Sequence, residues 1–250
     1  MKIARVQKGN EAFYAALENG VFRRIAGLPY EGITFTGETY PPDTVKLLAP
    51  AEPTKVVAVG LNYAKHAGEM KEALPENPIL FIKPATAVLA PEGNIAYPRA
   101  SQRVDYEAEL AVIIGKTCKN VTVDDAESYI FGYTALNDVT ARDLQKKDGQ
   151  WTRAKSFDTF CPFGPYIDTD YDPRGRRVQS VLNGEVRQDG NTRDMIFDVY
   201  QLIAFISECM TLNPGDVIAT GTPEGIGPMQ PGDMIEIKIE GLEPLQNHVQ

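Results

Sequence analysis

The sequence contains few cysteines. Cys118, Cys161 and Cys209 are the only three, and none of them forms a C-x-x-C pair. An odd number without that spacing argues against a disulfide framework and against a structural zinc site. We therefore expect free, buried and inert thiols in a reducing compartment.

The chain also lacks the features that direct a protein to a membrane or to nucleic acid. No apolar run approaches the ~20 residues of a membrane span, and residues 1–17 lack the core of a signal peptide. Lysine and arginine number 25 against 34 acidic residues, giving a net charge of -9, and they form no cluster. We expect a cytoplasmic protein whose partner is a small molecule, not a membrane or a nucleic acid.

The length is sufficient for one large domain with a small companion. Residues 1–48 read as short strand-like pieces separated by turns, and the proline-containing stretch 49–53 is typical of a linker. We predict a small N-terminal module at residues 1–50 and a catalytic domain at residues 51–250.

The larger domain alternates short apolar runs with glycine and proline, which is typical of strands. Residues 195–210 have helical periodicity, and Asn213-Pro214-Gly215 ends that pattern. No βαβ rhythm is present, so the prediction is a β-dominated α+β fold. Strands are expected at 55–60, 79–82, 108–114, 130–136, 217–219 and 234–239.

The most informative segment is acidic. Asp105, Glu107 and Glu109 recur at every second position, so on a strand they would project from one face. Two carboxylates about 7 Å apart repel by roughly 2 kcal/mol at an effective dielectric of about 20. A hard divalent cation would offset this repulsion. A solvated charged edge is the alternative.

Another carboxylate follows a second apolar run. Asp138 comes soon after residues 130–136, where the end of a buried strand would direct it into a pocket. The alternative is an Asx turn that leads into residues 139–142.

One histidine has a carboxylate at helical spacing. His66 and Glu69 would be neighbours if residues 62–69 are helical. A carboxylate that orients an imidazole makes a general base, although a surface pair is the alternative. Residues 65–78 are polar and rich in helix breakers, which suits a lid that orders on substrate.

From about Lys55 onward the sequence resembles the fumarylacetoacetate hydrolase family. Several long motifs occur in the family's order, and residues 1–50 are similar to the module that precedes the domain in bacterial members. The motifs are GLNYAKHAGE (60–69), FIKPATA (81–87), DYEAELAVIIGK (105–116), GYTALNDVTARDLQ (132–145), WTRAKSFDTFCPFGP (151–165), LNGEVRQ (182–188) and PGDVIATGTPEGIG (214–227).

The resemblance implies a mixed-sheet β-roll of the family's C-terminal type, usually a homodimer, and a role in aromatic catabolism. It implies Mg²⁺ or Mn²⁺ held by two Glu and one Asp, which map to Glu107, Glu109 and Asp138. It also implies that His66 and Glu69 form a catalytic dyad on a mobile lid.

The resemblance further implies a set of pocket residues. Lys155 would stabilise an enolate, while Lys83, Arg142, Gln145 and Thr222 would bind substrate. For Lys83 and Lys155 the alternative is a side chain that extends past apolar neighbours to the surface. The sequence has neither the Gly-Lys-Ser/Thr of a phosphate loop nor a Gly-x-Ser-x-Gly motif, so phosphate binding and serine-hydrolase chemistry have no support.

Together these residues predict a divalent-metal-dependent enzyme that cleaves a carbon–carbon bond in a 2,4-dioxo acid of the acylpyruvate or fumarylpyruvate type. The 2-oxo carboxylate would chelate the metal, His66 would activate water, and the metal and Lys155 would stabilise the leaving enolate. Two alternatives use the same metal, namely oxaloacetate-type decarboxylation and isomerisation of 2-hydroxyhepta-2,4-diene-1,7-dioate. A non-catalytic binding protein is a third alternative, but binding alone would not require the histidine–glutamate pair.

Overall fold

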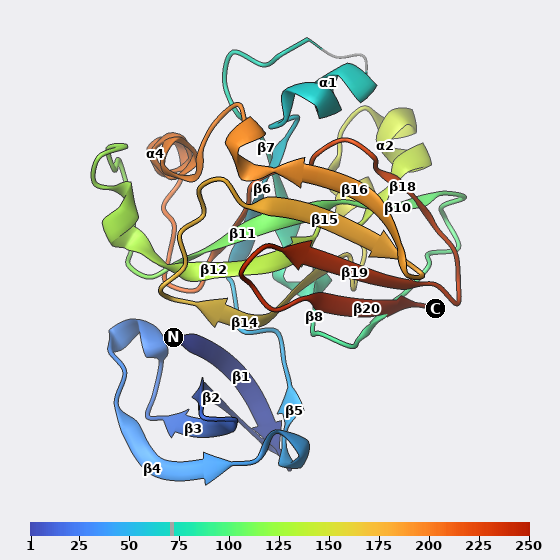
Figure 1. Cartoon of the computed structure of the whole chain (residues 1–250). Coiled ribbons are helices and arrows are strands. Elements are labelled where there is room, and N and C mark those ends of the chain that lie inside the picture. Colours follow the sequence, from blue (N-terminus) through green and yellow to red (C-terminus); the bar gives the residue numbers. More distant parts are fainter. Residues whose placement is uncertain (71–72) are drawn as a thin grey trace.

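The computed structural model describes residues 1–70 and 73–250. Strands dominate and pair both antiparallel and parallel, so the predicted β-dominated α+β fold with mixed sheets is confirmed (Figure 1). In the part of the chain that is described, no helix is long and apolar enough to cross a membrane. The helices are α1 (Ala64–Met70), α2 (Arg142–Asp148), α3 (Thr152–Lys155) and α4 (Val199–Cys209), and the 3-10 helices are η1 (Pro29–Glu31), η2 (Pro42–Thr44), η3 (Ala85–Ala87), η4 (Ala126–Tyr129) and η5 (Thr192–Asp194).

The largest sheet has 12 strands among the described residues. In spatial order it consists of β4 (Phe35–Tyr40), β3 (Val21–Ile25), β2 (Glu11–Glu18), β1 (Lys2–Lys8), β14 (Cys161–Asp168), β12 (Ile130–Asn137), β11 (Ala108–Ile114), β17 (Val217–Ala219), β6 (Lys55–Gly60) and β7 (Ile79–Pro84), with β5 (Lys46–Leu47) beside β1 and β8 (Val88–Leu89) beside β14. The strands predicted at 55–60, 108–114 and 217–219 are therefore confirmed with their bounds.

Two smaller sheets complete the strand structure of the described residues. One has the order β13 (Thr140–Ala141), β10 (Val104–Tyr106) and β18 (Gly227–Met229). The other has the order β16 (Glu185–Asn191), β15 (Arg177–Leu182), β19 (Met234–Ile239), β20 (Leu245–Val249) and β9 (Asn94–Ile95).

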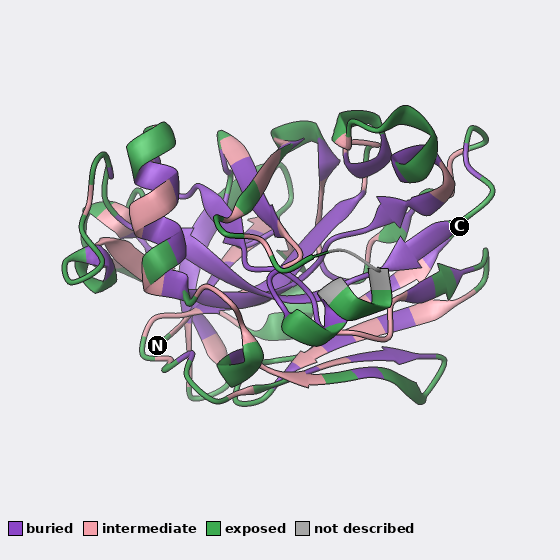
Figure 2. Cartoon of the chain, turned by 90° about the horizontal axis from the view of Figure 1, so that it is seen from above, coloured by how far each residue is buried: buried purple, intermediate pink, exposed green. Residues whose placement is uncertain are grey.

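Strand β11 lies at the centre of the core and is buried along its whole length. Because successive side chains point to opposite faces, Leu110 and Val112 pack with β19 and α4, whereas Ala111 and Ile113 pack with β14. Burial on both faces explains the continuous apolar run of its sequence. Figure 2 shows the buried strands at the centre, with exposed residues along the rim and on the helices.

The N-terminal strands join the largest sheet through β1, which pairs with β14 at Lys2–Asp168. One of the turns expected within residues 1–48 lies at Asn19 and Gly20, which both have positive φ, and β2 and β3 form a hairpin around them. Strand β2 was not predicted. The boundary between a module at residues 1–50 and a domain at 51–250 stays a prediction.

Helix α4 begins later than its apolar periodicity indicates. Asp198 caps it, because its side chain accepts from the N–H groups of Tyr200 and Gln201, and the Gln201 side chain bonds back to the Asp198 N–H. This capping box fixes the first turn at Val199 rather than at residue 195. At the other end of α4 Cys209 is exposed, so the prediction of three buried thiols is wrong for this residue, although all three are free.

Asp216 joins the segment before β6 to the turn before β17. Its buried carboxylate accepts from Thr54 N (2.9 Å), Thr54 Oγ1 (2.7 Å), Lys55 N (3.2 Å) and Asn213 N (2.9 Å), and it pairs with the Lys55 ammonium. Burial raises its pKa, but the Lys55 charge and these donors outweigh burial, so the pKa is lowered.

We expect Asp216→Asn to lower the free energy of unfolding by about 2–4 kcal/mol, because the charged acceptor is lost in a buried site. The carboxylate's contribution is fully present above the ordinary aspartate pKa of about 3.9 and is lost as pH falls toward its lowered folded value. Urea unfolding across this pH range measures both effects, with exposed Asp124→Asn as control. Equal stability of Asp216→Asn and the wild type at neutral pH would contradict this assignment.

Candidate metal centre and active-site cavity

Glu107 lies where the chain passes from one sheet to another. Strand β10 ends at Tyr106 and belongs to the three-stranded sheet, while β11 starts at Ala108 in the largest sheet. In β12, Asn137 pairs with Ala108, and Asp138 N donates to Glu107 O at 2.9 Å. This register brings the carboxylates of Glu107, Glu109 and Asp138 together, with one oxygen from each within 4.8 Å of the others.

Asp105 does not join this group. The sequence predicts that it projects beside Glu107 and Glu109, but the strand is interrupted at Glu107. Asp105 instead accepts from Arg103 Nε at 2.8 Å and from Arg142 Nε at 2.9 Å. The prediction that the three side chains share one face is therefore wrong for Asp105. It binds Arg142 instead, and Arg142 in turn contacts Glu107.

Three buried cations surround the carboxylates. Lys155 Nζ donates to Glu107 Oε2 at 2.9 Å and to Asp138 Oδ2 at 2.6 Å, and Arg142 pairs with Glu107. Lys83 is fully buried behind Asp138, to which it donates, and it is not among the described residues that line the cavity. Burial opposes ionisation of Glu107, but the Lys155 and Arg142 charges outweigh burial and lower its pKa.

Glu109 is different because no cation pairs with it among the described residues. Its carboxylate is 1% exposed and accepts from Gly221 N at 2.8 Å. Burial raises its pKa well above the usual value, and the neighbouring Asp138 and Glu107 charges raise it further. A buried carboxylate beside two others, without a cation of its own, fits a hard divalent ion bound by oxygen ligands. The residues present therefore fit the metal that the sequence predicts.

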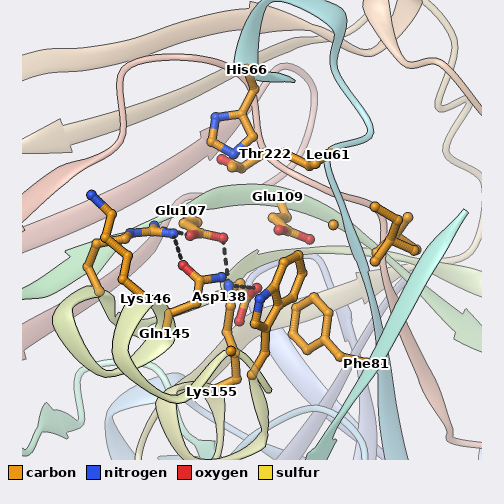
Figure 3. A pocket seen from close by; sticks show the side chains of 16 residues that line it. Leu61, His66, Phe81, Glu107, Glu109, Asp138, Gln145, Lys146, Lys155 and Thr222 are labelled. Atoms are coloured by element: carbon orange, nitrogen blue, oxygen red, sulfur yellow. Dashed lines mark hydrogen bonds and ion pairs between the residues drawn. The ribbon is translucent and has the colours of Figure 1, made fainter. Parts of the chain in front are cut away.

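His66 and Glu69 meet on α1, as their spacing predicts. His66 Nδ1 lies 3.0 Å from Glu69 Oε2, and His66 is 5% exposed at the cavity wall. Glu69 also accepts from Gly225 N at 3.2 Å, which connects α1 to the glycine loop formed by residues 221–227. Figure 3 shows the imidazole above Glu107 and Glu109.

The glycine loop packs against the acidic strand. Thr222 Oγ1 donates to Ala108 O at 2.9 Å and accepts from Gln188 Nε2 at 2.7 Å, so its single hydroxyl hydrogen is already used. Gly221 has φ +96°, and a Cβ there would come within 2.7 Å of Asn62 Cβ. Thr222 lines the cavity, but its hydroxyl holds the loop to the strand.

Gln188 is a site residue whose role the sequence did not predict. Its Oε1 accepts from Ala108 N at 2.9 Å, and its Nε2 donates to Thr222 Oγ1 and to Pro223 O. It therefore connects the residue between the two glutamates to the glycine loop. In the sequence, Gln188 was marked only by its place in the motif LNGEVRQ. Its partners Ala108 and Thr222 lie far from it along the chain, so no local spacing could reveal these contacts.

The cavity between these elements has a volume of about 330 Å³, which suits a small molecule. His66, the three carboxylates, Arg142, Gln145, Lys155 and Thr222 all line it, so the structure brings together most of the predicted site residues. Its other described lining residues are Val59, Gly60, Leu61, Ile79, Phe81, Lys146, Gly149 and Trp151.

We predict that α1 and the residues after it form the lid inferred for residues 65–78, of which 71–72 lie outside the described residues. Contacts of α1 with the glycine loop include Glu69–Gly225 and a Lys65–Glu224 ion pair at 3.4 Å. Amide hydrogen exchange in α1 should be faster than in β11 and should slow when Mg²⁺ and oxalate are added. Equal protection of α1 and β11 in the free protein would count against a lid.

A β-roll with three buried carboxylates under a histidine–glutamate pair defines a small-molecule site with a candidate metal centre. Residues 55–250 match the family model Fumarylacetoacetate (FAA) hydrolase C-terminal, and residues 1–50 match the model Rv2993c-like, N-terminal. The chain belongs to the fumarylacetoacetate hydrolase family, as its motifs indicate.

Similar proteins include two whose names state different reactions. Protein Rv2993c of Mycobacterium tuberculosis is 44% identical and covers 100% of this chain and 98% of its own. Oxaloacetate tautomerase Fahd2a, mitochondrial, of Rattus norvegicus is 42% identical over 84% of this chain and 71% of its own. The crystal structure of 5-carboxymethyl-2-hydroxymuconate delta-isomerase from Mycobacterium smegmatis has a TM-score of 0.95 at 44% identity and covers 100% of this chain and 99% of its own.

Proposed function

We propose that this protein is a divalent-metal-dependent enzyme that cleaves a carbon–carbon bond in a small 2,4-dioxo acid of the acylpyruvate or fumarylpyruvate type. The observation that supports this most strongly is that the His66–Glu69 pair and the three carboxylates line or border one cavity. A binding protein would not need a base oriented toward its ligand.

Glu107, Glu109 and Asp138 would hold Mg²⁺ or Mn²⁺, because carboxylate oxygens are the preferred ligands of these ions. When bound, such an ion polarises a keto oxygen and offsets the charge of an enolate.

His66 is the proposed base. An imidazole that donates its Nδ1–H to Glu69 carries its lone pair on Nε2, which can take a proton from water. Glu69 then stabilises the imidazolium that forms.

Lys155 and Gln145 supply hydrogen-bond donors to the substrate. Lys155 uses two of its three N–H bonds on Glu107 and Asp138, which leaves one for a developing oxyanion. Gln145 Oε1 accepts from Arg142 Nη1 at 2.6 Å, so the amide NH₂ is left as a donor. Lys83 would act indirectly, by holding Asp138 from behind, and Thr222 would offer its backbone N–H.

A second candidate is proton transfer without bond cleavage, meaning isomerisation or keto–enol tautomerisation of a 2-oxo acid. The names of two similar proteins, a delta-isomerase and an oxaloacetate tautomerase, favour it. His66 would again move the proton, and the N–H donors of Lys155 and Gln145 would again stabilise the negative oxygen. Oxaloacetate-type decarboxylation is a further use of the site.

A substrate panel separates these reactions. The protein is incubated with an acylpyruvate, oxaloacetate and a 2-hydroxydienoate, each with and without Mg²⁺, and products are identified. Metal-dependent release of pyruvate from the acylpyruvate is the expected result. Isomerised or tautomerised product alone would favour the second candidate, and no turnover of any compound would contradict an enzyme of this class.

The remaining predictions are a homodimer, a cytoplasmic location, and division of the chain into a module at residues 1–50 and a catalytic domain at 51–250. Two separate family models that meet near residue 50 support that division.

A further inference from the structure

Helix α2 presents one face to the cavity. Arg142, Gln145 and Lys146 lie at positions i, i+3 and i+4, which share a side of a helix. All three line the cavity, whereas Lys147, one residue further, does not. Two exposed lysines that are adjacent in sequence therefore differ in what they face.

Lys146 is also the cavity cation that lacks a protein counter-ion among the described residues. Arg142 is paired with Asp105 and Glu107, and Lys155 with Glu107 and Asp138. Their charges are balanced before any substrate arrives. An anionic group of the ligand that lies away from the carboxylate cluster would therefore meet Lys146 first.

The buried cations are already committed to the carboxylate cluster. Lys83 pairs with Asp138, and the half-exposed Arg103 shares Asp105 with Arg142. None of these cations is left without a carboxylate partner, so a distal anionic group of the ligand depends on a different cation.

The opposite side of the cavity is apolar. Phe81 and Trp151 form an edge-to-face pair with centroids 5.3 Å apart, and both line the cavity with Ile79. Figure 3 shows Lys146 and Phe81 on opposite sides of the three carboxylates. A ligand carbon chain can therefore lie on the aromatic side while a terminal carboxylate points to the lysine.

From these contacts we infer that Lys146 binds the distal carboxylate of a dianionic 2-oxo acid and makes the site selective for dicarboxylates. This inference deepens the proposed function, on which it rests for the position of the 2-oxo end. Both lysines lie in the last turn of α2, where cations favour the helix dipole, so a purely structural role would apply to Lys147 equally.

The test is calorimetric binding to the Mg²⁺-loaded protein. Two matched pairs of acids are used, 2-oxoglutarate with 2-oxopentanoate and 2-oxoadipate with 2-oxohexanoate, which differ only in a terminal carboxylate. The wild type should bind at least one dicarboxylate about tenfold or more tightly than its partner, the usual effect of one charge-assisted hydrogen bond. Lys146→Met should remove this preference by weakening the dicarboxylate alone.

Lys147→Met is the matched control and should leave both affinities within about twofold. Three results would overturn the assignment: no dicarboxylate preference in the wild type, equal weakening of both acids by Lys146→Met, or equal effects of the two lysine variants. Because binding requires no turnover, failure of the proposed reaction in the substrate panel stays distinguishable from failure of this inference.

Discussion

Replacing His66 with alanine is expected to lower turnover by ~10²–10⁴-fold, the usual contribution of a positioned general base. The imidazole lies at the cavity wall, 3.0 Å from Glu69 and outside the three-carboxylate cluster. His66→Ala should therefore bind Mg²⁺ and oxalate nearly as the wild type does. Steady-state rates and isothermal titration measure the two effects separately.

Glu69→Gln is expected to lower turnover less than His66→Ala does. It removes the charge that orients the imidazole but keeps a side chain of the same shape, so its loss of turnover should be smaller than that of His66→Ala. Near-normal turnover of His66→Ala would show that the base is another group. The reaction would then be metal-driven decarboxylation or isomerisation rather than attack by activated water.

Glu109→Gln is expected to abolish stabilisation of the protein by Mg²⁺. The wild-type free energy of unfolding should rise by about 2.7 kcal/mol at an ion concentration 100 times Kd. Without metal, Glu109→Gln should be as stable as the wild type or more stable, because the variant lacks a buried carboxylate whose pKa is raised by burial and by two neighbouring carboxylates. Thermal and urea unfolding with and without Mg²⁺ measure both quantities.

Glu107→Gln is the matched comparison, because Glu107 has cation partners and Glu109 has none among the described residues. Removing the Glu107 charge leaves Lys155 and Arg142 buried without it, so this variant should lose about 3–5 kcal/mol even in the absence of metal. Equal free energies of unfolding for Glu107→Gln and Glu109→Gln without metal would contradict the conclusion that cations stabilise only the Glu107 carboxylate.

Local patterns predicted the strands well because burial on both faces leaves a continuous apolar run. The bounds of β6 and β11 follow directly from such runs. The start of α4 was misplaced because apolar spacing does not register the cap at Asp198.

The site was predictable only in part. The i, i+2 spacing of Glu107 and Glu109 brings them together even though the strand is interrupted at Glu107, but the same rule fails for Asp105. Asp138 reaches them through the pairing of β11 with β12, which no spacing encodes. The placement of Gln188 likewise depends on tertiary contacts.

The most direct test of the central claim is turnover measured against Mg²⁺ concentration after the protein has been stripped with a chelator, using the substrate that the panel identifies. We predict negligible turnover in the stripped wild type, saturable recovery on adding Mg²⁺, and no recovery in Glu109→Gln at the same concentrations. Full turnover in the stripped protein, or equal recovery in wild type and Glu109→Gln, would contradict a metal centre at Glu107, Glu109 and Asp138.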